Sequence, residues 1–284
     1  MTPYVETKPN REQSLSLKKA IAVLRCFTND MHSRSLPEIV TATGIPRTIC
    51  YRLLSTLEDE GMANRDPATG RYSLSMALFA IGSTALETNK LAATASHYLS
   101  ALSAQTQDTV LLIVEHEGAG MCISRVDGDF PIQQNALSVG KAWPIHVGGA
   151  PFCILSFMPD SQREKILSQP LDALTKHTVT DLNKIRARIA QVRMQGYAVG
   201  HEDALDYLVA IGAPIFDHLE KLIGAISVGG LTQRYPPERI AAVAVLACEA
   251  AAAISAKLGY RLSQPDLVTK NTASANPLTT HPMT

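Results

Sequence analysis

Residues 35–74 constrain the fold of this chain more than any other stretch. A helix is predicted to begin at Ser35, because Glu38 follows three residues later and completes a capping box. The run 43–46, TGIP, ends this helix and begins another. Gly accepts left-handed backbone angles and Pro is preset for a first helical turn. Two short helices joined by so tight a turn are typical of a helix-turn-helix.

The second helix, predicted over residues 47–60, has one apolar and one polar face at the helical period. Its apolar face carries Ile49, Cys50, Leu53, Leu54 and Leu57. The polar face has no acid before Glu58, so it can donate hydrogen bonds to phosphates and base edges without like-charge repulsion. We predict a recognition helix for DNA, with the candidate contacts Arg47, Thr48, Tyr51, Arg52 and Ser55.

Two short extended segments, residues 62–65 and 71–74, follow that helix, and Pro67 and Gly70 lie in the turn between them. The predicted hairpin is a wing, with Arg65 and Arg71 at its two ends as candidate contacts to the sugar-phosphate backbone. A three-helix domain with solvated arginines is the alternative, since helix pairs with a Gly turn are common in proteins that never touch DNA. The polar face without acidic residues before Glu58, together with the wing, favours DNA binding.

The chain of 284 residues exceeds a typical single core, so two domains are expected. With 26 basic and 26 acidic residues its formal net charge is zero, which excludes a general polycation and makes any DNA affinity local. The fold class is predicted as α+β. The expected order is an N-terminal arm (1–13), a winged helix-turn-helix (14–75), a linker and dimerisation helix (76–90), an α/β domain (91–260) and a disordered tail (261–284).

The α/β part is predicted to be a single sheet with helices packed on it. Its expected strands lie at residues 109–115, 121–126, 132–137, 197–200, 209–216 and 222–229. Helices are expected at residues 89–104, 152–157, 181–195 and 237–258. The alanine-rich stretch 240–256 is interrupted by Glu249 and suits a packed helix better than a membrane span. The chain begins without a secretory pattern, so a cytoplasmic protein without membrane contact is expected.

The five cysteines occur singly, without a CxxC pair or a histidine at metal spacing, so no metal and no cofactor is expected. A free cysteine in an apolar pattern behaves as a small hydrophobe.

Several short motifs occur in a characteristic order: TGIPR (43–47), YRLLSTL (51–57), YSL (72–74), VGK (139–141), PIH (144–146), GYA (196–198), APIFD (213–217) and AISV (225–228). Over residues 15–260 the chain resembles the IclR-type bacterial transcriptional regulators, which join a winged helix-turn-helix to a GAF-like effector-binding domain. The resemblance implies an operator-binding repressor or activator controlled by a small molecule. A two-fold pair of recognition helices reads successive major grooves, so a homodimer or homotetramer on double-stranded DNA is expected. The candidate residues for the contact between subunits are Met76, Phe79 and Ile81.

The resemblance also places an effector pocket. It implies that Gly149 and Ala150 receive an acid's carboxylate and that the hydroxyl of Ser227 bonds the effector. The chain departs from the pattern at three pocket positions, where larger or polar residues are replaced by Gly200, Ala210 and Gly229. These changes predict a small organic acid with an apolar or aromatic part. Close packing within a tight sheet is the alternative explanation of these three residues.

Two other functions fit parts of the sequence. His146 and Ser227 suggest a hydrolase-like enzyme, but the sequence lacks GxSxG, HExxH and phosphate-loop motifs, so no catalytic residue is predicted. The other alternative is a DNA-binding and dimerisation protein that needs no ligand.

Overall fold

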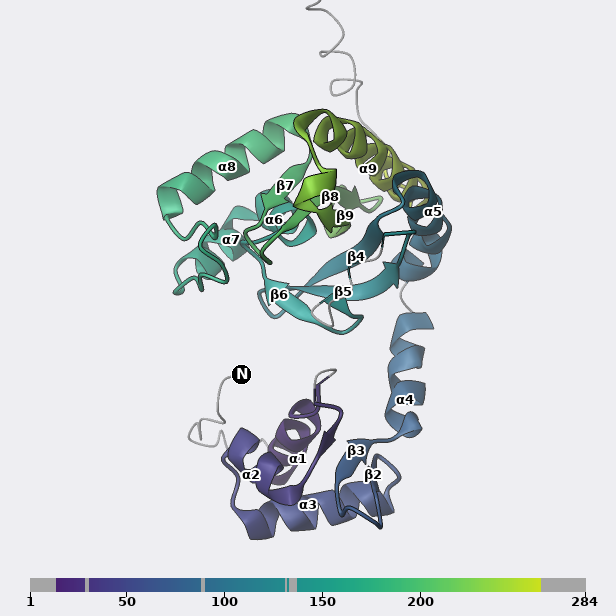
Figure 1. The fold of residues 1–284 in the computed structure, drawn as a ribbon, viewed down its shortest axis with the longest axis vertical. Coiled ribbons are helices and arrows are strands. Elements are labelled where there is room, and N and C mark those ends of the chain that lie inside the picture. Colours follow the sequence, from purple (N-terminus) through teal and green to yellow (C-terminus); the bar gives the residue numbers. More distant parts are fainter. Residues whose placement is uncertain (1–13, 29–30, 88–89, 131, 133–136, 262–284) are drawn as a thin grey trace, which may run out of the picture. The chain divides into compact units, whose positions relative to one another are not determined.

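The computed structural model describes residues 14–28, 31–87, 90–130, 132 and 137–261. The chain divides into two compact units, residues 1–89 and 90–284 (Figure 1). The helix predicted as a linker, α4 (Met76–Glu87), is grouped with the first unit. The predicted arm and nearly all of the predicted tail lie outside the described residues.

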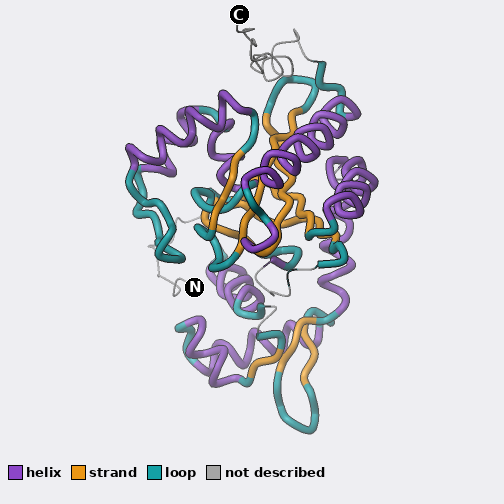
Figure 2. Tube along the Cα trace, turned by 45° about the horizontal axis from the view of Figure 1, so that its top comes forward, coloured by secondary structure: helices purple, strands orange, loops and turns teal. Residues whose placement is uncertain are grey.

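Besides α4, the described part of the first unit contains three helices and a three-stranded antiparallel sheet of order β1-β3-β2. The helices are α1 (Leu15–Arg25), α2 (Leu36–Thr43) and α3 (Arg47–Asp59), and the strands are β1 (Ser33–Arg34), β2 (Ala63–Arg65) and β3 (Tyr72–Leu74). Val23, Ile39, Leu54 and Tyr72 meet in its buried core. Figure 2 shows the β2–β3 hairpin with its long loop extending away from the helices. This arrangement is a winged helix-turn-helix.

Local sequence accounts for the helix-turn-helix. The Ser35 N–H donates to Glu38 Oε2 at 2.7 Å, which forms the predicted capping box at the start of α2. Gly44 ends α2 with a φ of 69°, in the left-handed region that glycine accepts without strain. The Cys50 thiol donates to the Ile45 carbonyl at 3.4 Å, and this hydrogen bond holds the turn against the start of α3. Strand β1 was not expected from the sequence.

The second unit is built on a six-stranded antiparallel sheet of order β6-β5-β4-β9-β8-β7. Its strands are β4 (Thr109–His116), β5 (Ala119–Val126), β6 (Ala142–Pro144), β7 (Ala198–His201), β8 (Leu208–Phe216) and β9 (Leu222–Leu231). Its helices are α5 (Lys90–Thr106), α6 (Ala150–Phe157), α7 (Asp160–Leu167), α8 (Leu182–Gln195), the 3₁₀ turn η2 (Thr232–Arg234) and α9 (Pro237–Lys257).

The structure of this unit differs from the prediction at one expected strand and at two elements that were not expected. Residues 133–136 of the strand expected at 132–137 lie outside the described residues, and its two ends, Ile132 and Leu137, are not in a strand. The strand that pairs with β5 at the sheet edge is β6, which was not predicted. Helix α7 was not predicted either.

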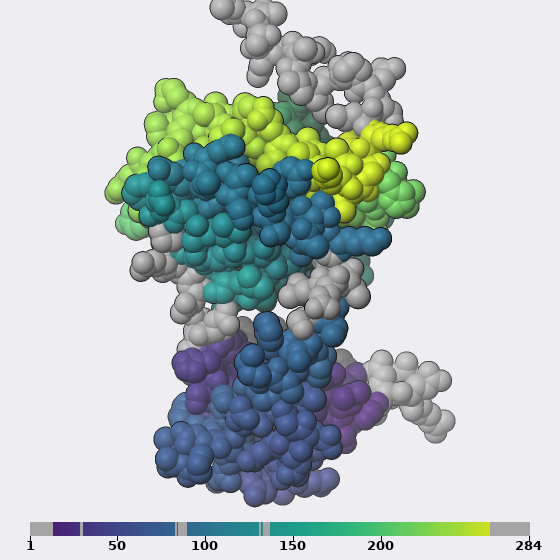
Figure 3. All heavy atoms as spheres, turned by 90° about the vertical axis from the view of Figure 1, so that its right-hand side faces the viewer, coloured from purple at the N-terminus to yellow at the C-terminus, as the bar shows by residue number. Residues whose placement is uncertain are grey.

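Both faces of the sheet are covered. Side chains alternate along β4, so Val110 and Leu112 pack toward α5 and α9, whereas Leu111 and Ile113 pack toward α6 and α8. Figure 3 shows α5 and the C-terminal end of α9 side by side on one face of this unit. A sheet with helices on both faces, together with the helical first unit, is the predicted α+β class.

Helix α9 is the one helix among the described residues that is long and apolar enough to cross a membrane. One of its faces is buried in the core, through Val243, Ala247, Ala251 and Ile254. This packing agrees with the expected core helix.

Candidate functional site

A groove of about 530 Å³ runs between the start of α3 and the wing. Arg47, Thr48 and Tyr51 line it from α3, and Arg65 lines it from β2. The residues on its remaining walls are Ser35, Leu36, Pro37, Thr69, Gly70 and Tyr72, so no acid lines the described groove. The structure thus brings four predicted DNA-contact residues together in a positively charged groove. Arg52 is exposed and Ser55 half-buried elsewhere on α3.

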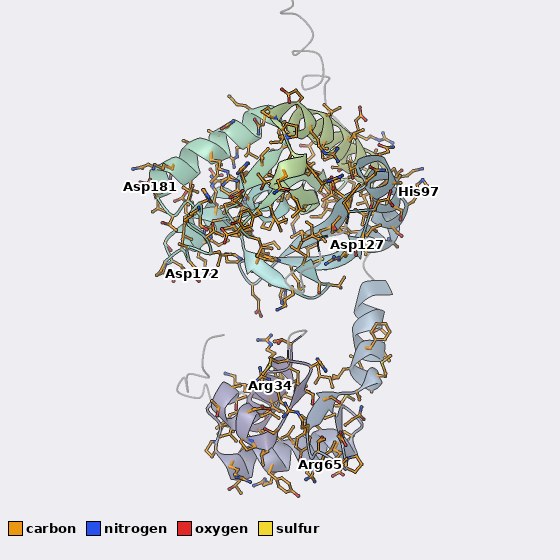
Figure 4. The ribbon with its side chains drawn as sticks, in the orientation of Figure 1. Arg34, Arg65, His97, Asp127, Asp172 and Asp181 are labelled. Atoms are coloured by element: carbon orange, nitrogen blue, oxygen red, sulfur yellow. The ribbon has the colours of Figure 1, made fainter. Side chains whose placement is uncertain are left out.

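The turn of the wing is preformed. Asp66 Oδ1 accepts the backbone N–H groups of Ala68 at 2.8 Å and Thr69 at 3.4 Å, and these hydrogen bonds hold the pKa of Asp66 below its usual value. Gly70 closes the turn with a φ of 67°. The Arg65 guanidinium lies 5.6 Å from the centre of the Tyr72 ring, which positions its charge beside α3. Figure 4 shows Arg65 at the hairpin.

Arg71, predicted as a second contact to the DNA backbone, makes three hydrogen bonds within the protein. Its Nη2 donates to the Ser33 carbonyl and to Glu38 Oε2, both at 2.8 Å, and its Nε donates to Ser33 Oγ at 3.2 Å. Glu38 Oε2 also caps α2, so one carboxylate joins the helix start to the wing. These bonds use the guanidinium of Arg71 within the protein, where it fastens β3 to β1 and α2.

In the second unit a small cavity of about 50 Å³ lies on the sheet face that carries α6. Gly200 on β7, Ala210 on β8, Gly229 on β9 and Thr109 on β4 are consecutive partners across four strands and line it as one row. Ser227, two residues before Gly229, also lines the cavity and is 5% exposed. Among the described residues, the Ser227 hydroxyl has no hydrogen-bond partner. Four predicted effector residues therefore share one cavity.

Gly149 and Ala150 are not among the residues that line this cavity. A Cβ on Gly149 would lie 2.7 Å from the backbone nitrogen of Gly212 and 2.8 Å from the carbonyl of Ala210. The start of α6 therefore rests directly on β8. The turn residue that reaches the cavity is Gly148, whose N–H donates to Asp203 Oδ1 at 2.9 Å.

Gly200 lines the cavity but does not enlarge it. A Cβ there would lie 2.5 Å from the Gly148 backbone and 2.7 Å from Asp203 Oδ1. The close-packing explanation therefore holds for Gly200, and the polar group expected near this position comes from Asp203 instead. Gly229 differs, because among the described residues a Cβ there would meet Ile132 at 3.3 Å and the Val209 carbonyl at 3.6 Å and no closer atom.

Asp203 is the only charged residue among those that line the described cavity, and it is 4% exposed. The polar run around Asp203 in the sequence is typical of a solvated helix or loop face, so its burial was not expected. Its second oxygen, Oδ2, accepts from Arg188 Nη1 at 3.0 Å. Arg188 also donates to the Val199 carbonyl at 2.6 Å and stacks 4.0 Å from the centre of the Phe152 ring. The buried carboxylate is thus neutralised by a fixed guanidinium.

Sequence reasoning missed Arg188, although a signal was present. Ile185, Ile189 and Val192 form the buried face of α8, and Arg188 follows Ile185 by three residues on that side. A charge on the apolar side of a helix needs a buried partner.

The arrangement of His146 does not fit a hydrolase. Its Nε2 lies 3.0 Å from the Asp172 carbonyl, and burial lowers its pKa from the usual 6.5. His146 lines an open groove with Glu115, Lys165 and Asp172, whereas Ser227 lines the cavity. Figure 4 places Asp172 in the loop between α7 and α8. Among the described residues no group of three or more His, Cys, Asp or Glu side chains is placed to hold a metal ion.

Both units of the chain match known protein families. Residues 16–67 match the IclR helix-turn-helix domain, and residues 83–256 match the bacterial transcriptional regulator IclR C-terminal family. The chain is 28% identical over 251 residues to the HTH-type transcriptional regulator KipR of Bacillus subtilis (strain 168). The aligned region covers 88% of this chain and 99% of that protein.

Solved structures share the architecture. An IclR transcriptional regulator from Alicyclobacillus acidocaldarius has a TM-score of 0.76 at 28% identity, over 86% of this chain and 98% of that one. An IclR homologue from Microbacterium hydrocarbonoxydans, complexed with 4-hydroxybenzoate, has the same fold, with a TM-score of 0.75 at 22% identity over 86% of this chain and 98% of that one.

The matched families and relatives are transcriptional regulators rather than enzymes, as predicted. The C-terminal family alone matches more than half of the residues of this chain. The chain therefore belongs to the IclR family of bacterial transcriptional regulators.

Proposed function

We propose that the chain is a cytoplasmic regulator that reads an operator with α3 and its wing and is controlled by a small organic acid. The observation that carries the DNA-binding assignment is the groove without acids, in which Arg47, Thr48, Tyr51 and Arg65 face the same space. Arg47, Thr48, Tyr51 and Arg52 supply contacts to base edges and phosphates, and Ser55 supports them. Arg65 contacts the sugar-phosphate backbone, and Arg71 supports this contact by holding the wing.

Selection of binding sites from random duplex DNA by the full chain tests this proposal and supplies an operator for further work. Arg47→Ala is expected to cost about 1–3 kcal/mol and to relax preference at one base pair, since a bidentate contact to guanine is lost. Lys165→Ala, on α7 of the second unit, is the matched control and is expected to bind normally. Selection of no sequence, or unchanged specificity in Arg47→Ala, contradicts the assignment.

The working unit is a homodimer, or a homotetramer made from such dimers, and its operator is an inverted repeat. One recognition helix contacts only a few base pairs, and two-fold symmetry brings two of them into successive major grooves. The exposed apolar side chains of α4 support this proposal: Met76 is 74%, Phe79 65% and Ile81 55% exposed. Apolar side chains grouped on one helix are a candidate contact between copies.

The effector is proposed to be a small organic acid with an apolar or aromatic part, bound beside Ser227, Ala210 and Gly229. The 4-hydroxybenzoate complex of the related structure supports an aromatic acid, and Leu111, Ile132 and Leu208 give the cavity an apolar wall. Because about 50 Å³ holds only one or two water molecules, the cavity must open when such an acid binds. Gly149 and Ala150 are proposed to become accessible in that opened state.

A thermal-shift screen of aromatic and aliphatic acids, followed by calorimetry, tests the effector. Gly229→Leu fills the cavity and is expected to abolish the response while operator binding is retained. Coupling between effector and operator is expected to be about 5- to 150-fold in affinity, transmitted through α4. Operator binding that no acid alters favours the alternative, a DNA-binding and dimerisation protein that needs no ligand.

A further inference from the structure

The pair formed by Arg188 and the Gly148 amide is a complete receptor for a carboxylate. Arg188 Nη1 donates to one oxygen of Asp203 at 3.0 Å, and the Gly148 N–H donates to the other at 2.9 Å. A guanidinium and a backbone amide that each bind one oxygen of the same carboxylate fix both its position and its plane. The chain fills this receptor with its own side chain.

The receptor does not depend on Asp203 for its shape. Arg188 is held independently by its 2.6 Å hydrogen bond to the Val199 carbonyl and by the Phe152 ring beneath it. Gly148 belongs to the turn that leads into α6, and α6 rests on the backbone of β8. Removal of the Asp203 carboxylate therefore leaves a cation and an amide in place.

The receptor adjoins the cavity, since Gly148, Asp203 and Ser227 all line it. Ser227 is 5% exposed, and its hydroxyl, for which no hydrogen bond to a described residue is present, lies at the cavity wall where a ligand can reach it. As it stands, however, the cavity is unfavourable for an acid. Its one charged lining residue is a carboxylate, and the nearby cation and amide are already engaged with it.

The loop that carries Asp203 has to move for the receptor to open. Residues 202–207 connect β7 to β8, and Glu202 and Tyr207 have φ angles of 55° and 62°, in the left-handed region. The loop is tied to the preceding segment by Thr178 Oγ1, which donates to the Asp203 carbonyl at 2.7 Å, and by Thr175 Oγ1, which donates to the Glu202 carbonyl at 2.7 Å. The loop is also held by the Glu202 N–H, which donates to the Leu208 carbonyl at 2.8 Å, and by His177 Nε2, which lies 3.3 Å from Glu202 Oε2. These contacts have to shift when the internal carboxylate leaves the receptor.

We propose that Asp203 occupies the effector's anion site and that an acid effector binds by exchange, its carboxylate taking over Arg188 and the Gly148 amide from Asp203. This inference rests on the proposed control by an organic acid and assigns Arg188 as the effector's counter-ion. Asp203 then sets specificity, because only a group that replaces a carboxylate can open the receptor. The apolar part of the acid lies toward Ser227 and Gly229.

Asp203→Ala in the full chain tests the exchange, with acetate as the probe. The vacated receptor is expected to bind acetate, so that acetate raises the melting temperature of the variant saturably and leaves the parent unchanged. Acetamide and sodium chloride at the same concentrations are the controls, since neither supplies a carboxylate. The double variant Asp203→Ala, Arg188→Met is expected to lose the response to acetate. Equal effects of acetate and acetamide, or an undiminished response of the double variant, overturn the proposal.

Asp203→Asn keeps the protein testable if the alanine variant fails to fold. Its amide oxygen can still accept from Gly148, but its NH2 group then faces Arg188 and cannot accept from the guanidinium, so the neutral side chain is easier to displace. Acids are expected to bind this variant about tenfold more tightly than the parent or better. Unchanged or weaker binding of acids contradicts the exchange. Operator binding is measured on the same samples, so a failure of the exchange is distinguished from a failure of the proposed regulator.

Discussion

Arg65 and Arg71 lie at the two ends of one hairpin, and their partners give them different roles. Arg65 stacks against Tyr72 and borders the groove, whereas Arg71 is bound to Ser33 and Glu38. The sequence places both at the wing, but it does not show which guanidinium is already used. That distinction depends on β1, a strand of two residues that exists only because β3 pairs with it.

Arg65→Ala is expected to weaken binding to all DNA sequences and to lower the slope of log affinity against log salt by about 1, since one phosphate contact is lost. Arg71→Ala is expected instead to lower the melting temperature and leave this slope unchanged. Fluorescence anisotropy at several salt concentrations, together with melting curves, measures both. A normal melting temperature with a reduced slope in Arg71→Ala would restore the direct contact predicted from the sequence.

His146 makes the stability of the second unit depend on pH. Burial lowers its pKa in the folded state below the usual 6.5, so the unfolded chain takes up a proton more readily. Its contribution to stability is therefore complete above pH 6.5 and is lost as the pH falls below that value. His146→Gln keeps a donor for the Asp172 carbonyl and is expected to reduce this loss. Melting temperatures between about pH 5 and pH 8 test it, and equal pH dependence in both proteins contradicts it.

At the scale of elements, the contact between α6 and β8 positions the cavity. A Cβ on Gly212 would lie 2.2 Å from the carbonyl carbon of Gly149, so the helix approaches the strand at backbone distance. Gly212→Ala is expected to destabilise the second unit by about 1–3 kcal/mol, because the helix must move away. Gly82→Ala in α4 meets nothing within 4 Å and is expected to be stabilising by about 0.5–1 kcal/mol. Urea denaturation compares the two, and similar values for both contradict the close approach.

Elements with strong local signals were predictable. The capping box at Ser35 and the glycine at the end of α2 define one helix without any tertiary contact. Helix α7, DSQREKIL, has no apolar stripe, and β6 has three residues that depend on pairing with β5, so neither was predicted. The prediction of the cavity's polarity was incomplete for a related reason. Gly200 suggested lost polarity, but Asp203 returns a carboxylate to the same place through the fold of its loop.

For the whole molecule, the order of motifs along the chain indicated the family, but the assembly remains a prediction. Phe79→Glu is expected to yield a monomer and to weaken operator binding, because it puts a charge on the proposed contact face. Met194→Glu on α8 is the control, since Met194 is 77% exposed and lies in the second unit. Light scattering with and without operator measures the mass. A parent protein that is monomeric at micromolar concentration rules out the dimer.

All five cysteines contribute their side chains to the interior, with Cys248 only partly accessible. Burial raises the pKa of Cys26, Cys122 and Cys248 to about 11, and it also raises the pKa of Cys50 and Cys153. At neutral pH hardly any thiolate is present to react with a maleimide. A single new cysteine at Ala68, on the tip of the wing, would therefore accept a fluorescent label selectively. The native protein is in effect already prepared for spectroscopy, with no cysteine needing to be removed.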